Sequence, residues 1–278
     1  MTDYARPRDL QEALDLRAQH PDWMMLAGGT DLMVNANHRP APPGILDLWR
    51  LADLGGIVAA PDRVTIGAGA TWYEVENDPA ILERWLPLAL AAREIGALQI
   101  QARATLGGNV GNSSPVGDSL PVLLALDAEL ELASVRGKRR VAYKDFCTGY
   151  KKTVLAPDEL IVSATLPAPN ARTRTTWRKV GTRRAQSISK VMGSAAIELD
   201  AGIVVSARVA LGAVADRPIR VAAVENAVKG LSPAHAADAA RAALRSAIKP
   251  IDDVRSTASY RLEVAENLVA RFFSGILS

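Results

Sequence analysis

The sequence has few of the residues that metal sites and disulfides require. Its 278 residues include one cysteine and three histidines. A lone Cys147 excludes an internal disulfide and a cysteine-ligated iron–sulfur cluster within the chain, because both need more than one cysteine. His20, His38 and His235 are far apart in the sequence and indicate no histidine metal cluster. We therefore expect this chain to bind no metal ion by itself.

Long apolar runs are also missing. The longest ones, such as residues 86–92, have about seven residues, whereas a helix needs roughly 20 to cross a bilayer. The N-terminal residues show neither an apolar core region nor a small-residue cleavage site, so the sequence predicts no secretory signal. These absences predict a cytoplasmic protein that does not insert into membranes.

Charge of one sign is not in large excess. The chain has 33 Lys and Arg against 30 Asp and Glu, and this net charge of +3 is far from the imbalance expected of a nucleic-acid binder. Residues 172–190 include seven basic residues and no acidic one, but Trp177 is their only aromatic, which favours a flavin or partner contact over nucleic acid. Residues 136–140 predict a charged hairpin turn that is either solvated or a docking patch for an acidic partner.

Two Gly-Gly pairs occur where the chain has few other signs of regular structure. The apolar residues 24–27 end at Gly28 and Gly29, which predicts a buried strand running into a turn with free backbone amides. Residues 105–118 contain four glycines, so we expect a loop there, with Gly107 and Gly108 free to adopt positive φ, before a helix that begins near Asp118. Two such loops can hold the pyrophosphate of a dinucleotide through amides and hydroxyls. The alternative is that each pair is only a tight turn.

The rest of the chain alternates between helical and strand patterns. Helical spacing predicts helices at about residues 10–20, 86–95, 220–229, 233–248 and 257–273. Strand patterns occur at residues 45–48, 128–133 and 160–166, and residues 191–213 predict a hairpin that turns at residues 200–202. Pro167 and Pro169 end the strand at 160–166, and we place the main domain boundary there.

Several of these motifs together resemble one family. They are Leu-Ala-Gly-Gly-Thr-Asp-Leu at residues 26–32, Gln-Ala-Arg-Ala-Thr-Leu-Gly-Gly-Asn at 101–109 with Ser114, Pro115 and Asp118, and Thr-Gly-Tyr-Lys-Lys-Thr at 148–153. The chain is similar to the FAD-binding medium subunit of molybdenum hydroxylases, the xanthine dehydrogenase and carbon monoxide dehydrogenase family. The resemblance covers essentially the whole chain, and residues 101–118 are its most specific part.

The resemblance implies an α+β fold. Residues 1–169 would form an FAD-binding domain of the vanillyl-alcohol-oxidase/molybdenum-hydroxylase type, with two α/β subdomains at about 1–55 and 56–169. Residues 170–278 would form a C-terminal α+β domain with an antiparallel sheet and helices.

The resemblance also implies non-covalent FAD and no catalytic side chain, because the cofactor carries the chemistry. Residues 25–32 and 105–109 would hold the pyrophosphate and ribityl, and Asp118 would lie near the ribityl or the ring. Ile161 would pack on the flavin, and Lys179 would approach its ring or acceptor side. Asp118 has an alternative role as a helix N-cap, and Ile161 one as strand core. The implied FAD contacts are Met25, Leu26, Ala27, Gly28, Gly29, Thr30, Asp31, Leu32, Thr105, Leu106, Gly107, Gly108, Asn109, Asp118, Ile161 and Lys179.

As a function, the resemblance implies a subunit that passes electrons from partner iron–sulfur clusters through FAD to an external acceptor such as NAD or oxygen. The molybdenum cofactor and [2Fe-2S] clusters would belong to a large and a small partner subunit, in an (αβγ)2 heterohexamer. The single cysteine supports this division. Two alternatives stay open: a self-contained FAD-dependent oxidoreductase of the same fold, and a non-catalytic basic binding module, which would leave both Gly-Gly pairs unexplained. Purine, aldehyde, N-heterocycle and carbon monoxide substrates fit the sequence equally.

Overall fold

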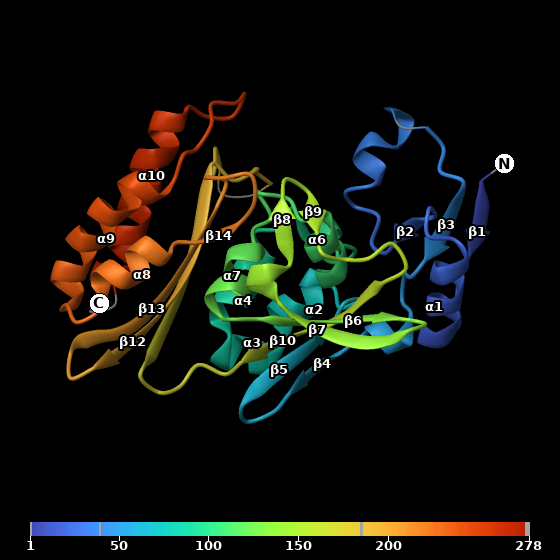
Figure 1. Ribbon diagram of the computed structural model, residues 1–278, viewed down its shortest axis with the longest axis horizontal. Coiled ribbons are helices and arrows are strands. Elements are labelled where there is room, and N and C mark those ends of the chain that lie inside the picture. The colour runs from blue at the N-terminus through green and yellow to red at the C-terminus, as the bar shows by residue number, and fades with distance from the viewer. Residues whose placement is uncertain (1, 39, 184–185, 276–278) are drawn as a thin grey trace.

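A computed structural model describes residues 2–38, 40–183 and 186–275. The N-terminal part is a three-stranded parallel sheet of order β1-β3-β2, shown in blue in Figure 1. Helix α1 (Leu10–Gln19) begins where the sequence predicts, because the Asp9 carboxylate accepts a hydrogen bond from the Glu12 amide at 2.8 Å. Ala13 and Leu14 of this helix are buried against Leu46. The other elements are β1 (Asp3–Ala5), β2 (Met24–Leu26), η1 (Met33–His38), β3 (Gly44–Asp47) and η2 (Ala52–Leu54).

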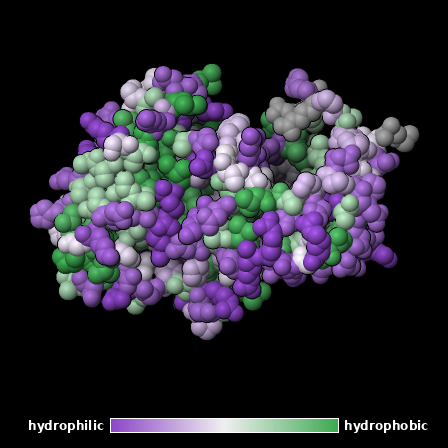
Figure 2. Space-filling view, viewed as in Figure 1, coloured by the Kyte–Doolittle hydropathy of each residue, from purple (hydrophilic) through white to green (hydrophobic). Residues whose placement is uncertain are grey.

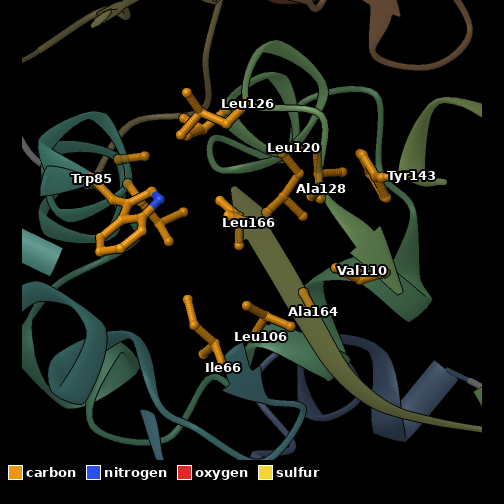
Figure 3. Close-up of a cluster of buried hydrophobic side chains, with 14 of the residues drawn as sticks. Ile66, Trp85, Leu106, Val110, Leu120, Leu126, Ala128, Tyr143, Ala164 and Leu166 are labelled. Atoms are coloured by element: carbon orange, nitrogen blue, oxygen red, sulfur yellow. The ribbon is translucent and has the colours of Figure 1, made fainter. Parts of the chain in front are cut away.

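The central part is a five-stranded antiparallel sheet of order β4-β5-β10-β6-β7. Its middle strand, β10 (Leu160–Pro167), is buried along most of its length, as the β-branched run predicts. Figure 3 shows Ala164 and Leu166 of this strand together with Ile66, Leu106 and Trp85 in the main core. The other strands are β4 (Ile57–Ala59), β5 (Arg63–Gly67), β6 (Glu129–Ser134) and β7 (Gly137–Ala142). The helices are α2 (Trp72–Asn77), α3 (Pro79–Arg84), α4 (Leu86–Arg93), α5 (Leu98–Gln101), α6 (Leu106–Asn112) and α7 (Leu120–Ala125).

The basic residues at 136–140 lie mostly in an edge strand, not in the predicted hairpin turn. The turn itself is short and ends at Gly137, whose φ of +121° only glycine adopts easily. Each cation has a carboxylate partner within the chain: Arg136 with Asp158, Lys138 with Glu131, Arg139 with Glu159 and Arg140 with Glu129. These four side chains are exposed to solvent as well as paired within the chain, and a docking role for them stays a prediction.

The best-formed of these pairs leads to a stability prediction. The buried Glu159 carboxylate accepts hydrogen bonds from Arg139 Nε and Nη2 at 2.6 and 2.7 Å and from the Ala156 amide at 2.7 Å. The Arg139 contact lowers the pKa of Glu159, so the stability it contributes is present above the ordinary value of 4.5 and is lost as pH falls through the lowered value. We expect Glu159→Gln to cost about 1–3 kcal/mol in urea unfolding at pH 7. The difference from wild type should shrink below pH 4, and an equal difference at both pH values would contradict the assignment.

The C-terminal part is a four-stranded antiparallel sheet of order β11-β12-β13-β14 with three helices, as predicted. Strands β12 and β13 form the expected hairpin, which turns at Ala201 and Gly202. Helices α8 to α10 cover one face of this sheet, on the side away from the N-terminal part in Figure 1, and α4 and α7 pack on its other face. The bounds are β11 (Thr173–Val180), β12 (Val191–Asp200), β13 (Ile203–Gly212), β14 (Ile219–Arg220), α8 (Ala222–Val228), α9 (Pro233–Ala247) and α10 (Ala258–Ser274).

A small hairpin lies between β7 and β10 in the chain. It consists of β8 (Cys147–Gly149) and β9 (Lys152–Thr153), and η3 (Tyr143–Asp145) precedes it. None of the described helices has both the length and the apolar character needed to span a bilayer. Within the described ranges, no group of three or more His, Cys, Asp or Glu side chains is placed to hold a metal ion.

Candidate functional site

The first Gly-Gly pair forms a loop with open amides, as the sequence predicts. Met25 and Leu26 are in β2, and residues 27–32 connect this strand to η1. Gly29 has a φ of +75°, and its carbonyl accepts from the Met33 amide at 2.9 Å. The amides of residues 28–32 donate to no acceptor among the residues described. A run of unpaired amides around a residue with positive φ is a suitable cradle for an anion.

Gly28 has a different role from Gly29, because it lets two segments touch. A Cβ on Gly28 would lie 1.8 Å from the carbonyl oxygen of Arg103 and 3.0 Å from the Ala104 amide nitrogen. The first loop therefore packs directly on the backbone that leads into α6. In Figure 1 the chain that follows β2 approaches the segment before α6, and Figure 2 shows a recess in the surface on this side of the N-terminal part.

The second Gly-Gly pair is not in a loop, and this prediction was wrong. Gly107 and Gly108 lie in helix α6, and neither has positive φ. Thr105 is the N-cap, and its hydroxyl accepts from the Gly108 amide at 3.1 Å. Figure 3 shows Leu106 and Val110, one helical turn apart, pointing into the core.

The first amides of α6 are already bonded within the chain. The Leu106 amide donates to the Ala70 carbonyl at 2.9 Å, and the Gly107 amide donates to the Ala68 carbonyl at 2.7 Å. A Cβ on Gly107 would lie 2.7 Å from that of Ala68, so this glycine allows α6 to pack closely on the end of β5. The expectation that both Gly-Gly segments offer free amides therefore holds only for residues 28–32. The Asn109 side chain points toward the start of α7, because its Oδ1 accepts a hydrogen bond from the Ser119 hydroxyl at 2.7 Å.

Asp118 and Lys179 come together, although 61 positions separate them in the sequence. Lys179 Nζ donates to the Asp118 carboxylate at 2.7 Å and to the Glu94 carbonyl at 3.1 Å. The Ser189 hydroxyl donates to the other carboxylate oxygen at 2.5 Å. The two charged side chains are 10% and 3% exposed, and burial raises the pKa of Asp118 while Lys179 and Ser189 oppose that rise.

This pair joins the start of α7 to strand β11. Asp118 is not the N-cap of α7, because that position belongs to Ser119. Its own carbonyl accepts from Trp177 Nε1 at 3.0 Å, so β11 contacts this residue twice. No local pattern indicates Ser189 or Glu94 as partners of this pair, because only the fold brings them together.

Ile161 lies in β10 and is 9% exposed, at the margin of the main core. Its Cδ1 is 3.6 Å from the position that a Cβ on Gly111 would take, which places it against α6. The strand-core role of Ile161 is confirmed, and its contact with the flavin stays a prediction. The predicted residues thus lie around α6. The first loop packs on the backbone before this helix, Ile161 packs on the helix itself, and Asp118 follows it in the chain.

Comparison with known proteins gives a consistent match over the chain. The family described as the FAD binding domain in molybdopterin dehydrogenase matches residues 1–169, and the CO dehydrogenase flavoprotein C-terminal domain matches residues 177–276. A putative xanthine dehydrogenase FAD-binding subunit of Escherichia coli K12 is 32% identical, with 98% of this chain and 94% of that protein covered. The nicotinate dehydrogenase FAD-subunit of Eubacterium barkeri is 29% identical, with 99% and 96% covered.

A solved structure agrees in fold. A chain of the carbon monoxide dehydrogenase from Hydrogenophaga pseudoflava superposes with a TM-score of 0.93 at 28% identity, over 97% of this chain and 95% of that chain. The predicted α+β fold, with its C-terminal antiparallel sheet and helices, is confirmed.

Proposed function

Because the chain belongs to the family of FAD-binding medium subunits of molybdenum hydroxylases, we propose that it passes electrons from partner iron–sulfur clusters to an external acceptor such as NAD or oxygen. The observation that carries this proposal is the run of unpaired amides at residues 28–32. Bound FAD supplies an acceptor of two electrons that releases one or two at a time. The chain's own part is to bind, orient and shield the cofactor.

The two Gly-Gly segments differ in the backbone amides that they offer to FAD, and their proposed roles differ accordingly. Met25 and Leu26 fix the strand that precedes the cradle, and residues 27–32 would bind the diphosphate through their amides. Residues 105–109 would support the cofactor through the Thr105 hydroxyl and the close packing of α6, since their first amides are occupied. Ile161 would pack on the flavin. Asp118 and Lys179 would act there as a bonded pair that holds the C-terminal domain against the FAD-binding domain.

The proposed partners are a large subunit with the molybdenum cofactor and a small subunit with [2Fe-2S] clusters, in an (αβγ)2 heterohexamer in the cytoplasm. Support comes from the single cysteine, Cys147, and from the lack of a metal-binding group in the described ranges. The relatives named above are FAD subunits of dehydrogenases for different substrates, which fits a substrate site on another chain. The domain division near residue 169 also stays a prediction, and β10 ends at Pro167 just before it.

We expect the purified chain to be yellow, with absorbance that dithionite bleaches. Neither the cradle nor α6 has a cysteine or histidine to link a flavin covalently, so denaturation should release intact FAD into the supernatant. Folded protein that stays colourless after incubation with FAD would contradict the proposal.

The same preparation distinguishes a subunit of a larger enzyme from a self-contained flavoenzyme. The chain alone should contain no iron or molybdenum and should not turn over a hydroxylase substrate, whereas co-expression with neighbouring reading frames should give a complex of three chain types. Substrate turnover by this polypeptide alone with stoichiometric FAD would favour the self-contained flavoenzyme.

A further inference from the structure

Arg103 contacts the anion cradle from outside it. This residue lies between α5 and α6, and its guanidinium carbon is 3.9 Å from the centroid of the Trp49 ring. Its Nε donates to the Gly28 carbonyl at 3.5 Å. Its own carbonyl oxygen is the atom that a Cβ on Gly28 would strike first. The side chain and the backbone of Arg103 therefore both lie against the cradle's first glycine.

The backbone of Trp49, the ring of which stacks with this guanidinium, is tied to the strands beside the cradle. Its amide donates to the Asp47 carboxylate at 2.9 Å, and Asp47 belongs to β3, which pairs with β2 just before the cradle. The Leu48 amide donates to the Leu26 carbonyl at 2.7 Å, which ties the same segment to the start of the loop. Cation–π stacking on a tryptophan holds an arginine in one orientation, because the guanidinium plane follows the ring face.

No carboxylate of the described chain pairs with Arg103, unlike the four cations at residues 136–140. The residue is exposed. An arginine that stacks on this ring and donates to a loop carbonyl, without an ion pair, is better suited to hold the loop than to stabilise the fold.

The contact to the Gly28 carbonyl sets the direction of the next amide. In a trans peptide the C=O and the following N–H point in opposite directions. With the Gly28 oxygen directed at Arg103, the Gly29 N–H points away from Arg103. Gly29 then turns the chain at a φ of +75°, so the orientation of this one peptide plane affects where the amides that follow it point.

We infer that Arg103 is a positioning residue for the FAD diphosphate: stacked on Trp49, it fixes the Gly28–Gly29 peptide so that the cradle amides are preorganised. This inference rests on the proposed function, and it adds a residue that neither Gly-Gly motif contains. Preorganised donors bind an anion more tightly because less ordering is needed on binding.

The test measures FAD affinity of the full-length apoprotein by fluorescence titration, with the thermal midpoint of the same preparation as a measure of folding. Arg103→Met keeps the stem over Trp49 and removes the donors. Arg103→Lys restores a donor and a charge. Arg50→Met is the matched control, because Arg50 also lies over the Trp49 ring, at 5.7 Å, but makes no contact with Gly28.

We expect Arg103→Met to weaken FAD binding about tenfold or more, with a thermal midpoint no lower than that of Arg50→Met. Arg103→Lys should regain much of the affinity, which a purely structural role would not predict. FAD affinity of Arg103→Met within twofold of wild type would overturn the inference and leave the proposed function intact. Wild-type protein that takes up no FAD would overturn the proposed function itself.

Discussion

Replacing Lys179 by methionine is expected to lower the free energy of unfolding by about 3–5 kcal/mol near neutral pH. The ammonium group is almost fully buried and is the only cation bonded to the Asp118 carboxylate among the residues described. Methionine fills most of the same volume, so the loss comes from leaving a buried carboxylate without its counter-charge, and from losing the bond to the Glu94 carbonyl. A urea titration followed by tryptophan fluorescence, to which Trp177 beside Asp118 contributes with the four other tryptophans, measures the change.

The pH dependence of this loss follows from the direction of the Asp118 pKa. Burial raises that pKa, and removing Lys179 takes away the largest opposing effect, so the folded-state pKa rises further above its unfolded value. A carboxyl with a raised folded pKa contributes most at low pH, and its contribution is lost as pH rises through the folded pKa. The deficit of Lys179→Met should therefore be smaller near pH 4 than at pH 8.

A double variant separates the ion pair from packing. Asp118→Asn with Lys179→Met removes both charges and should be more stable at pH 8 than Lys179→Met alone, because no unpaired charge stays buried. Ser189 can still donate to the asparagine oxygen. If the double variant is no more stable than the single one, packing and not charge accounts for the loss.

The sequence predicted most elements whose signals are local. The capping residue Asp9, the apolar stripe of α10 and the β-branched run of β10 each specify an element within a few residues, and the structure has all three. The hairpin of β12 and β13 is likewise specified by its turn at Ala201 and Gly202. The open amides after β2 also followed from local pattern, since an apolar strand ended at two glycines.

Helix α6 forms where the glycine-rich composition predicts a loop. Its three glycines argue against a helix, but Thr105 caps the first turn and Leu106 and Val110 bury one face beneath the sheet. The tertiary packing compensates for the poor helix propensity of the glycines, and Gly107 is required because Ala68 leaves no room for a Cβ.

Other features were missed because their partners are distant in the sequence. The position of Asp118 and Lys179 near the cofactor stays a prediction, but the sequence did not indicate that the two side chains bond to each other, which follows from the fold. The carboxylates that pair with the basic residues at 136–140 come from β6 and from the loop before β10. The sequence therefore showed a basic stretch but not the acidic side chains that pair with it. In the same way, nothing near Arg103 indicates Trp49 as its stacking partner.

Gly28→Val should abolish FAD uptake at concentrations that saturate wild type. The new Cβ would lie 1.8 Å from the Arg103 carbonyl oxygen, a backbone atom that cannot rotate away, so the cradle must move off the segment before α6. That movement also breaks the contact between Arg103 and the Gly28 carbonyl. Gly108→Val is a weaker test, because the positive φ expected at Gly108 is not found: this glycine is helical, and a Cβ there would meet only the Thr105 hydroxyl at 3.1 Å.

Gly111→Ala is the matched control for a glycine substitution beside the site. Gly111 is in α6, where alanine favours the helix by about 1 kcal/mol, and its Cβ would lie at an ordinary 3.6 Å from Ile161. This variant should keep FAD and should be no less stable than wild type. Full FAD occupancy in Gly28→Val, measured by flavin absorbance per protein, would show that the close contact between the two segments is not needed to shape the cradle. Loss of FAD in Gly28→Val with an unchanged far-UV spectrum would instead place the damage in the cradle, because the atoms nearest to a Cβ on Gly28 belong to the backbone of Arg103 and Ala104.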